Sequence, residues 1–467
     1  MAPKFGTSGL RGLVSELEPD LISQYIQAFV LACPIGTAIF VGRDLRPSSP
    51  RIAANVIAAA RAMGCDVVDC GALPTPALAR VAMADGAAAV MVTGSHIPAD
   101  RNGLKFYLPT GEITKADETT ILHKLGASAP PAPHPGTVTK NLSAEAEYTA
   151  RYLHAFGAGA LSGLRLGVYQ HSSVGRDLLS QTLEALGATT VALARSEGFV
   201  PVDTEAVPAE TRTDLTAWAK AHNLDAVLST DGDADRPLMT DGSGKVIAGD
   251  VLGVLTAQAL GAEVVCTPVS SNSMVQQLFS PRAVHLTRVG SPYVIAAMER
   301  VLAEDPHARV VGFEANGGFL LGFQADAASG PLDALMTRDA FLPLLAPLVA
   351  ARKQQRTLAQ ICEALPQRVT ATDRLENMPS EAGLAFLSHL TQNAKAREHF
   401  LSPLGAEVAV DLTDGLRISL EMNRIVHLRP SGNAPEFRVY VEATSETEVR
   451  NLLDRTLRMV KIGLANN

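Results

Sequence analysis

Three stretches of the chain share one pattern of hydrophobic and polar positions. Each begins with a short apolar run, continues through a serine-rich polar turn into an amphipathic stretch, and ends in a second apolar run. The three stretches are residues 38–70, 164–194 and 263–287. A strand, an amphipathic helix and a second strand form the unit that builds parallel sheets, and serines before a helix are typical N-caps. The pattern predicts three α/β regions, which arise either from an internal repeat or from three unrelated units.

Breaks in the pattern divide the chain further. Domain boundaries are predicted by the Pro- and Gly-rich segment at 126–136, by the turn-rich segment at 241–250, and by Leu365-Pro366. After the last break, the sequences EVAVDLTDGLRISL, RIVHLRPSG and FRVYVEA predict three strands before a final helix. The expected fold is three similar α/β domains with mixed or parallel sheets, followed by a smaller C-terminal α+β domain. The expected domains are residues 1–137, 138–243, 244–366 and 367–467.

Composition excludes several classes of protein. A chain of 467 residues is too long for one core, and a net charge of −8, with 40 basic and 48 acidic residues, argues against a nucleic-acid partner. The five scattered cysteines, without a Cys-x-x-Cys pair, argue against zinc and disulfides and predict a cytoplasmic location. The N-terminus has no signal-peptide pattern, and the apolar run FLPLLAPLVAA is short and holds two prolines, so no membrane association is expected.

A serine-bearing loop follows one predicted buried strand, in the sequence TGSHIPADRNGLKFY at 93–107. Ser95 is a candidate nucleophile, and His96 and Lys105 are candidate proton carriers. Asn102-Gly103 predicts a tight turn that would fold Lys105 back toward the serine. Taken alone, a polar loop without chemistry explains the segment equally well. No G-x-S-x-G motif is present, which disfavours a Ser-His-Asp hydrolase.

Three aspartates at alternate positions follow another predicted strand, in STDGDADRP at 229–237. In an extended segment Asp231, Asp233 and Asp235 would point to one side, where their charges repel unless a cation lies between them. Carboxylate oxygens suit Mg²⁺, whereas a calcium EF-hand would need a glutamate that is missing. A solvated acidic turn is the alternative.

Three further loops carry candidate binding groups. The loop in LRPSGNAPEFRVYVEA predicts a phosphate clamp made of Arg429, Ser431, the Gly432 backbone, Asn433 and Arg438. In VGFEANGGFLLG, Glu314 and Asn316 could hydrogen-bond a polyol, and FGTSGLRG brings Arg11 into a Gly/Ser loop. Each of these loops could also be an ordinary surface turn.

Four of these motifs, in this order, give the chain a family resemblance. TGSHIP, DGDADR, GFEANGG and RPSGNAPEFR resemble the serine, metal, sugar and phosphate loops of the α-D-phosphohexomutase family, and the resemblance covers essentially the whole chain. It implies four domains around a central cleft, one Mg²⁺ ion and a hexose phosphate substrate. It also implies a hexose 1,6-bisphosphate intermediate, with glucose or mannose 1,6-bisphosphate as activator.

The resemblance assigns roles residue by residue. Ser95 would carry a phosphoryl group and join Asp231, Asp233 and Asp235 as a metal ligand. Arg11 and Arg236 would flank that phosphoryl group, and Lys105, supported by His96, would transfer the proton of the reacting hydroxyl. The substrate phosphate would be held by Arg429, Ser431, Gly432, Asn433 and Arg438.

Two departures from the family pattern bear on catalysis and specificity. Many relatives end the sugar loop with Ser-Gly-His, whereas this chain has Asn316-Gly317-Gly318 and supplies no histidine. Ser291 stands where some relatives use histidine, and Arg288 beside it is expected to reach substrate. The Glu-Ala-Asn-Gly-Gly form resembles phosphomannomutases, which interconvert mannose 6-phosphate and mannose 1-phosphate.

Four alternatives to this function stay open at this stage. They are a phosphoglucomutase, a mutase with dual specificity, a phosphatase, and a non-catalytic protein that binds sugar phosphates. The expected assembly is a monomer or a homodimer.

Overall fold

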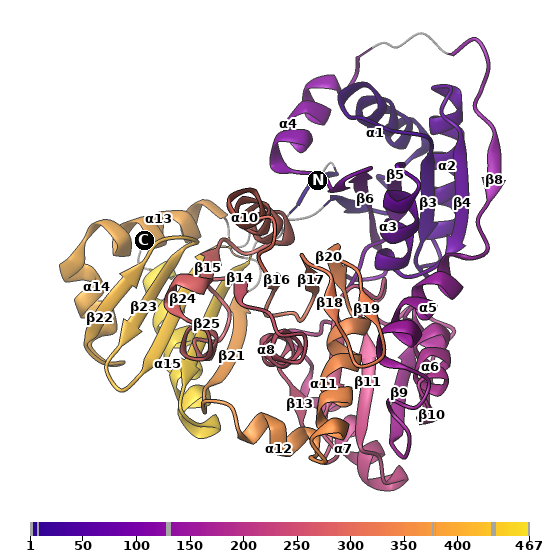
Figure 1. Cartoon of the computed structure of the whole chain (residues 1–467). Coiled ribbons are helices and arrows are strands. Elements are labelled where there is room, and N and C mark those ends of the chain that lie inside the picture. The colour runs from indigo at the N-terminus through magenta and orange to yellow at the C-terminus, as the bar shows by residue number, and fades with distance from the viewer. Residues whose placement is uncertain are drawn as a thin grey trace.

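Four large sheets follow one another along the chain. The computed structural model describes residues 3–6, 9–127, 132–375, 378, 380–430 and 436–465. In Figure 1 the sheets are arranged in chain order, from indigo at the upper right, through magenta and orange, to yellow at the left. Helices pack against each sheet, and separate apolar clusters form the cores of the first and last regions. The predicted fold class, three similar α/β regions and a C-terminal α+β region, is confirmed.

The first sheet has eight strands in the order β1-β2-β6-β5-β3-β4-β8, with β7 paired to β6. Its central strand β5, AAVMV, is buried on both faces, which explains its continuous apolar sequence. Its elements are β1 (Lys4–Phe5), β2 (Leu10–Leu13), α1 (Pro19–Ala32), β3 (Ile39–Arg43), α2 (Ser49–Ala62), β4 (Val67–Ala72), α3 (Thr75–Ala84), β5 (Ala88–Val92), β6 (Arg101–Leu108), β7 (Gly111–Glu112), α4 (Lys115–Lys124) and β8 (Val138–Lys140).

The second sheet has five strands in the order β10-β9-β11-β12-β13. Helix α7 ends at Asn223, a residue type that tolerates the left-handed conformation it adopts, with φ +49°. The elements are α5 (Ala144–Phe156), β9 (Arg165–His171), α6 (Arg176–Ala185), β10 (Thr189–Arg195), α7 (Ala209–His222), β11 (Ala226–Thr230), β12 (Pro237–Thr240) and β13 (Val246–Ile247).

The third sheet repeats this order as β15-β14-β16-β17-β20. Helix α11 is apolar on nearly every side and buried, so it forms part of the core shared with the second sheet. The elements are α8 (Gly249–Ala259), β14 (Val264–Pro268), α9 (Met274–Leu278), η1 (Pro281–Ala283), β15 (Val284–Thr287), α10 (Ser291–Glu304), β16 (Val310–Phe313), β17 (Phe319–Leu321), β18 (Ala325–Asp326), β19 (Pro331–Leu332), β20 (Leu335–Asp339), α11 (Phe341–Lys353) and α12 (Leu358–Glu363).

The first three sheets share one topology. In each, a strand, a helix and a second parallel strand are followed by a third parallel strand and then by an antiparallel one. The three stretches singled out in the sequence are the first two of these strands and the helix between them. The pattern is therefore a repeat at the level of the fold. The predicted serine N-caps are not formed: Ser48 and Ser273 precede α2 and α9 but accept no capping hydrogen bond with their side chains, and Gly175 precedes α6.

Two strands lie beyond the predicted domain boundaries. The prediction ended the first two domains at 137 and 243, but β8 pairs with β4 of the first sheet and β13 pairs with β12 of the second. We therefore propose Lys140 and Ile247 as the ends of the first two sheet regions. Backbone pairing decided these positions, because a strand of two or three residues has little signature in a sequence.

The fourth sheet is antiparallel, in the order β21-β25-β24-β23-β22. It has five strands, whereas the sequence pattern predicted three. EVAVDLTDGLRISL forms the two strands β22 and β23, and β21 comes from a polar segment that carries no clear strand pattern. The elements are β21 (Val369–Leu375), α13 (Ser380–Gln392), α14 (Ala394–Leu401), β22 (Glu407–Asp411), β23 (Leu416–Leu420), β24 (Arg424–Pro430), β25 (Phe437–Ala443) and α15 (Glu446–Ala465). Among the described residues, none of these or the preceding helices is both long and apolar enough to cross a bilayer.

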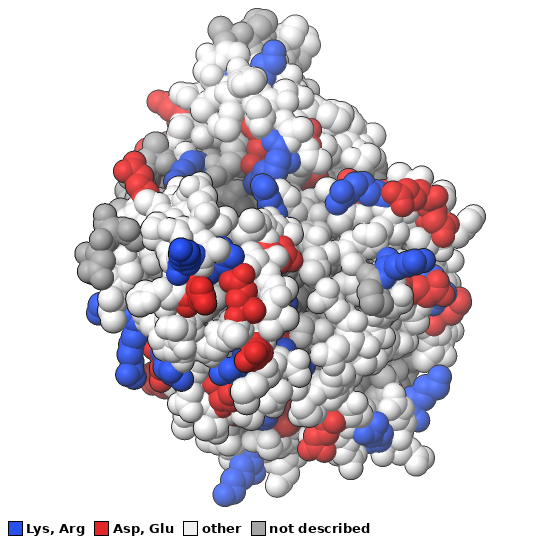
Figure 2. Space-filling model, turned by 90° about the vertical axis from the view of Figure 1, so that its left-hand side faces the viewer, with Lys and Arg blue, Asp and Glu red and all other residues white. Residues whose placement is uncertain are grey.

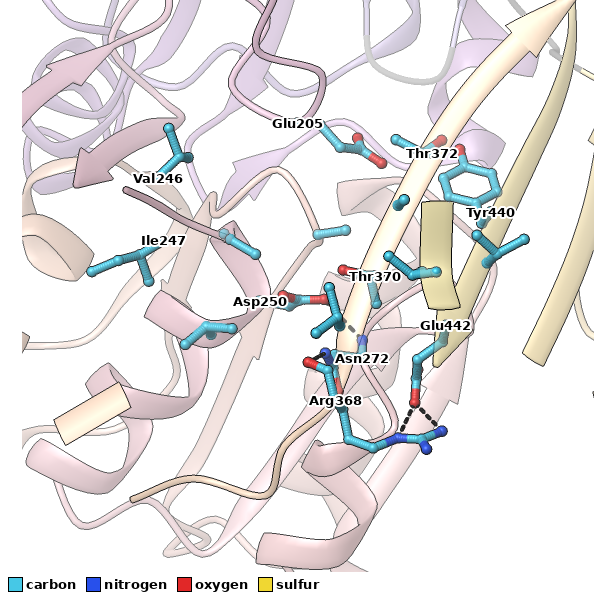
Figure 3. A pocket seen from close by; sticks show the side chains of 18 of the residues that line it. Glu205, Val246, Ile247, Asp250, Asn272, Arg368, Thr370, Thr372, Tyr440 and Glu442 are labelled. Atoms are coloured by element: carbon cyan, nitrogen blue, oxygen red, sulfur yellow. Dashed lines mark hydrogen bonds and ion pairs between the residues drawn. The ribbon is translucent and has the colours of Figure 1, made fainter. Parts of the chain in front are cut away.

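The fourth sheet borders the second and third regions across a cavity of about 1060 Å³. Figure 3 shows Glu442 of β25 and Arg368 in contact on one side of this cavity. Arg368 Nε donates to Glu442 Oε1 at 2.5 Å, and the backbone N–H of Ser273 donates to Oε2 at 2.9 Å. Both charged side chains are at least nine-tenths buried, and the hydrogen bond from Ser273 to Glu442 joins this ion pair of the C-terminal region to the third region.

Removing Arg368 alone should destabilise the protein strongly. Arg368→Met leaves Glu442 buried without its cation, which costs about 3–5 kcal/mol, whereas Arg368→Met with Glu442→Gln should recover much of this loss. The urea midpoint, followed by circular dichroism, measures both. Lys245→Met is the control, because Lys245 forms an exposed pair with Glu446 at 3.4 Å and should cost less than about 1 kcal/mol. Equal midpoints for Arg368→Met and Lys245→Met would contradict the expectation.

Candidate active site

Three loops that leave equivalent strands meet at one place. The serine loop (93–100) joins β5 to β6, the metal loop (231–236) joins β11 to β12, and the sugar loop (314–318) joins β16 to β17. Each therefore follows the third parallel strand of its sheet, at the carboxyl end, where α/β folds collect functional groups. A methyl group added to Gly232 would lie 2.7 Å from the Ser95 carbonyl oxygen, so the first two loops are in direct contact.

Ser95 is held in a strained and buried position. Its backbone φ is +54°, its side chain is 1 % exposed, and its N–H donates to Thr93 Oγ1 at 2.7 Å. The hydroxyl donates to Asp231 Oδ2 at 2.5 Å. A non-glycine residue in the left-handed region persists only where its surroundings enforce it, and such residues cluster at functional sites. The serine loop thus presents one hydroxyl directly to the metal loop.

Arg46 enforces the shape of the serine loop. This side chain is 1 % exposed, and its guanidinium donates to four backbone carbonyls around the loop, those of Ser95, Ile97, Pro98 and Arg101. It also pairs with Asp44 at 3.2 Å and stacks on Phe199 from the second region. The guanidinium therefore replaces the sheet hydrogen bonds that an irregular buried loop lacks.

The three aspartates of the metal loop converge as predicted, although not as an extended strand. Ala234 adopts φ +58° within a turn, and the three side chains each offer an oxygen within 4.8 Å of the others. All three are fully buried. Burial and the charges of Asp233 and Asp235 raise the pKa of Asp231 well above its usual range. Such a cluster calls for a cation.

The donor set fits a hard divalent cation. Among the described residues, Asp233 Oδ1 and Asp235 Oδ1 are buried and have no hydrogen-bond partner, although buried polar atoms nearly always have one. The other oxygens are occupied. Asp233 Oδ2 accepts from Thr75 Oγ1 at 2.6 Å and from Lys105 Nζ at 2.5 Å, and Lys105 also contacts Asp235 Oδ2 at 2.5 Å. One oxygen of each of these carboxylates is thus left for a metal such as Mg²⁺.

His96 is neutral and lies against an arginine. Burial first, and then the charge of Arg236, lower the pKa of His96 to about 3. Arg236 lies 3.0 Å from His96 Nδ1, and because a guanidinium can only donate, Nδ1 carries no proton. Ser95 Oγ is 3.3 Å from the same nitrogen. His96 therefore offers an acceptor near the serine rather than a cationic acid.

Strand β6 places Lys105 in the site, whereas the sequence predicted that a tight turn would do so. The predicted tight turn at Asn102-Gly103 is wrong, because both residues lie in β6, which pairs with β5 and β2. Gly103 serves close packing: a methyl group there would lie 2.1 Å from the Leu10 carbonyl oxygen and 2.9 Å from Arg11 Cδ. The resulting space lets Arg11 donate to the carbonyl of Thr93, the first residue of the serine loop, at 2.9 Å.

The sugar loop brings one carboxylate to the same cluster. Glu314 is 3 % exposed and lies 3.5 Å from Arg338, which in turn pairs with Asp235 at 2.9 Å. Asn316 turns its side-chain oxygen toward the backbone N–H of Gly318, at 3.0 Å, so in this structure it shapes the loop. Ser291, at the position where some relatives use histidine, donates to Glu112 of β7 at 2.9 Å.

A second group of charges lies on the C-terminal sheet. Arg429 and Arg438 are direct partners on β24 and β25, and Arg374 of β21 lies opposite Arg438, so three arginines form a row. Arg374 and Arg438 share the carboxylate of Glu436, at 3.5 and 3.4 Å, so the row keeps an excess of positive charge, which suits an anion site. Ser431, Gly432 and Asn433 lie outside the described residues. Arg288 donates to the Thr413 carbonyl at 3.3 Å, beside Asp414, the ion-pair partner of Arg429.

The row of arginines on the C-terminal sheet acts electrostatically on the serine loop. Burial is the main cause of the lowered pKa of His96, and the charges of Arg236 and Arg11 lower it further. The charge of Arg438 also lowers this pKa, so Arg438 lies within electrostatic reach of the serine loop. Figure 2 shows acidic and basic side chains interspersed over one face, with basic ones beside a hollow in its upper half. Arg438 therefore acts on the serine loop electrostatically from the C-terminal sheet.

Family models account for most of the chain. Four models match in order: phosphoglucomutase/phosphomannomutase α/β/α domain I at residues 2–129, domain II at 146–244, domain III at 248–369 and the C-terminal domain at 388–459. The chain belongs to the phosphoglucomutase/phosphomannomutase family. As predicted, it is an enzyme, an isomerase of the phosphohexomutase type, in the phosphomannomutase branch.

Curated relatives agree with this membership, and a solved structure has the same fold. A phosphomannomutase of Sinorhizobium fredii is 45 % identical over 98 % of this chain and 99 % of its own length. A phosphomannomutase of Salmonella muenchen is 42 % identical over 98 % of this chain and 95 % of its own. The fold matches a phosphoglucomutase/phosphomannomutase family protein of Burkholderia thailandensis with a TM-score of 0.75, at 23 % identity, over 98 % of this chain and 97 % of that one.

Several residues that build this family member's site carried no signal in the sequence. Arg46, Arg338 and Arg374 lie in segments without a recognised motif, and Glu112 sits in a two-residue strand. Arg46 lies in the loop after the first repeated strand, so its position before a predicted helix could have singled it out. Nothing comparable marks Arg338, which becomes part of the site only because β20 pairs with β17.

Proposed function

We propose that the enzyme is a Mg²⁺-dependent phosphomannomutase that interconverts mannose 6-phosphate and mannose 1-phosphate through phosphorylated Ser95. The single observation that carries this proposal is the contact between the Ser95 hydroxyl and the buried aspartate cluster. A nucleophilic hydroxyl beside an acidic metal cluster serves phosphoryl transfer, because a cation there neutralises charge that the transferred group brings. The relatives' names supply the sugar.

The proposed mechanism has two transfers. The phosphoryl group of Ser95 passes to the free hydroxyl of the hexose phosphate, giving a hexose 1,6-bisphosphate, and the other phosphate then returns to Ser95. Asp231, Asp233 and Asp235, with a Ser95 oxygen, would hold Mg²⁺, which supplies positive charge at the transferring group. Glucose or mannose 1,6-bisphosphate would restore phosphorylated Ser95 when it is lost.

The side chains of this chain take the remaining roles. Arg11 and Arg236 flank the phosphoryl group, and Arg429 and Arg438, with Ser431, Gly432 and Asn433, bind the distal phosphate of the substrate. Glu314 and Asn316 orient the sugar hydroxyls, and Arg288 approaches from the third sheet. Lys105 lies against two aspartates and, together with neutral His96, is proposed to handle the proton of the reacting hydroxyl. The cytoplasmic location and the monomeric or homodimeric state stay predictions.

Dual specificity for mannose and glucose is the second candidate. The two sugars differ in the orientation of the hydroxyl at C2, and one mismatched hydrogen bond costs only ~1–2 kcal/mol if water compensates. Because the described sugar loop offers one carboxylate and one amide, it has few groups with which to exclude either sugar.

Kinetics on both sugars test the proposal. We expect purified enzyme with Mg²⁺ and a trace of glucose 1,6-bisphosphate to convert mannose 1-phosphate to mannose 6-phosphate, with a kcat/KM at least equal to that for glucose 1-phosphate. Coupled assays for each 6-phosphate measure this. A higher kcat/KM for glucose 1-phosphate would favour a phosphoglucomutase. Release of inorganic phosphate in place of isomerisation would support a phosphatase, and no turnover would leave a binding protein.

A further inference from the structure

Arg338 connects two of the three loops that form the site. It lies on β20, is 2 % exposed, and extends between the metal loop and the sugar loop. Its guanidinium pairs with Asp235 Oδ2 at 2.9 Å and with Glu314 Oε2 at 3.5 Å. One planar cation therefore spans a carboxylate of the metal cluster and the carboxylate proposed to recognise the sugar.

Nearby carboxylates stabilise the positive charge of Arg338. The buried guanidinium of Arg338 contacts the carboxylates of Asp235 and Glu314, and the carboxylate of Glu112 acts on it electrostatically. Glu112 comes from the first sheet and is itself held by Thr337 Oγ1 at 2.8 Å and by Ser291 Oγ. The three carboxylates come from three different sheets, so Arg338 lies where the first, second and third regions meet.

The sugar loop has room for the side chain of Arg338 because residue 318 is a glycine. A methyl group added to Gly318 would lie 2.8 Å from Arg338 Cδ and 2.9 Å from Arg338 Cγ, closer than non-bonded carbon atoms approach. The last glycine of the sugar loop therefore admits Arg338 to the cluster. Its φ is not in the left-handed region, so packing rather than backbone conformation requires glycine there.

Arg338 also decides which oxygen of Asp235 is left for a metal. Arg338 and Lys105 both contact Oδ2, and among the described residues Oδ1 has no hydrogen-bond partner. Two cations on one oxygen fix the rotation of the carboxylate. Groups that orient a metal ligand in this way typically change affinity or activity by about 10–100-fold when removed.

We propose that Arg338 is a positioning residue that ties the sugar carboxylate Glu314 to the metal carboxylate Asp235. This inference rests on the proposed function. It makes Arg338 the residue that links sugar recognition to the metal centre. A sugar that engages Glu314 then acts through one guanidinium on the orientation of Asp235. The link is made by residues of the sugar loop, β20 and the metal loop, and it needs no movement of the C-terminal sheet.

Two variants and their combination test the link. Arg338→Ala should weaken Mg²⁺ binding to the substrate-free protein by about 10–100-fold and raise the KM for mannose 1-phosphate. Gly318→Ala keeps every charge but displaces the guanidinium, so it should shift both quantities in the same direction. In the double variant the methyl group has nothing left to displace, so the effects should not multiply. Calorimetric Mg²⁺ titration and steady-state kinetics provide the readouts.

Arg151→Ala is the matched control. Arg151 is also a buried arginine, 9 % exposed, but it donates to the Asp333 carbonyl, away from the three loops. The Mg²⁺ affinity of the Arg151→Ala protein should stay within about twofold of the wild-type value. If Arg338→Ala does not fold, Arg338→Lys gives the same comparison, because lysine keeps the charge but cannot span both carboxylates.

The positioning role is overturned if Arg338→Ala and Arg338→Lys keep wild-type Mg²⁺ affinity and KM, or if the losses of Gly318→Ala and Arg338→Ala multiply in the double variant. The proposed function fails separately, when the wild-type protein shows no mutase turnover. The calorimetric result still decides the role of Arg338 in that case, because it needs no substrate.

Discussion

Ser95→Ala is expected to abolish mutase turnover, lowering kcat by more than about a thousandfold, and to remove the phosphoryl group from the protein. The hydroxyl is the only part of the side chain that the substitution removes, and that hydroxyl contacts Asp231. Alanine and serine tolerate a φ of +54° about equally, so the serine loop should keep its shape. Intact-mass analysis of both proteins, beside the coupled assay, measures the two effects together.

The control for this experiment is another buried serine. Ser172 is 2 % exposed and accepts a hydrogen bond from the N–H of Val200 at 2.8 Å, and among the described residues its hydroxyl forms no hydrogen bond with the three loops. Ser172→Ala should cost about 1 kcal/mol of stability and leave kcat and the phosphoryl group unchanged. A wild-type mass without a phosphoryl group, together with full activity of Ser95→Ala, would refute the role proposed for Ser95.

Asp231→Asn should have the second largest effect, with opposite signs for activity and for the stability of the metal-free protein. Activity should fall by at least about a hundredfold, because a metal ligand is lost. Without Mg²⁺ the variant should melt at a higher temperature than the wild type, because the substitution removes one of three buried, mutually repelling carboxylates. The asparagine oxygen can still accept from the backbone N–H groups of Asp235 and Arg236.

Mg²⁺ should reverse this order of stability. At about 100 times its Kd, Mg²⁺ should stabilise the wild type by about 2.7 kcal/mol and the variant by much less. Thermal unfolding in a chelator and in excess Mg²⁺ gives all four midpoints. Asp241→Asn serves as control, because Asp241 caps a turn after β12 and should leave the response to Mg²⁺ intact. An Asp231→Asn protein that retains both turnover and the stabilisation by Mg²⁺ would rule out this metal site.

Sequence reasoning was most successful where a short segment carries its own chemistry. Ser95 and the three aspartates follow buried strands, and their residue types made them a candidate nucleophile and a candidate metal site, whereas their sharing of one place was implied only by the family resemblance. It failed where pairing between strands overrides local preference. Asn102-Gly103 has the composition of a tight turn, yet the antiparallel neighbours β2 and β5 hold it in a strand, where the missing side chain of Gly103 makes room for Arg11.

The sequence by itself determined the α/β class, the three strand–helix–strand units and the loops that hold the reactive groups, because periodicity and residue type are local properties of a chain. Only the tertiary structure decided which distant residues complete the site. Arg46 shapes the serine loop and Arg338 joins two carboxylates from different sheets, and no motif in the sequence marks either residue for these contacts. A buried arginine is stable only where several chain segments together supply its acceptors, and their meeting depends on how the sheets pack.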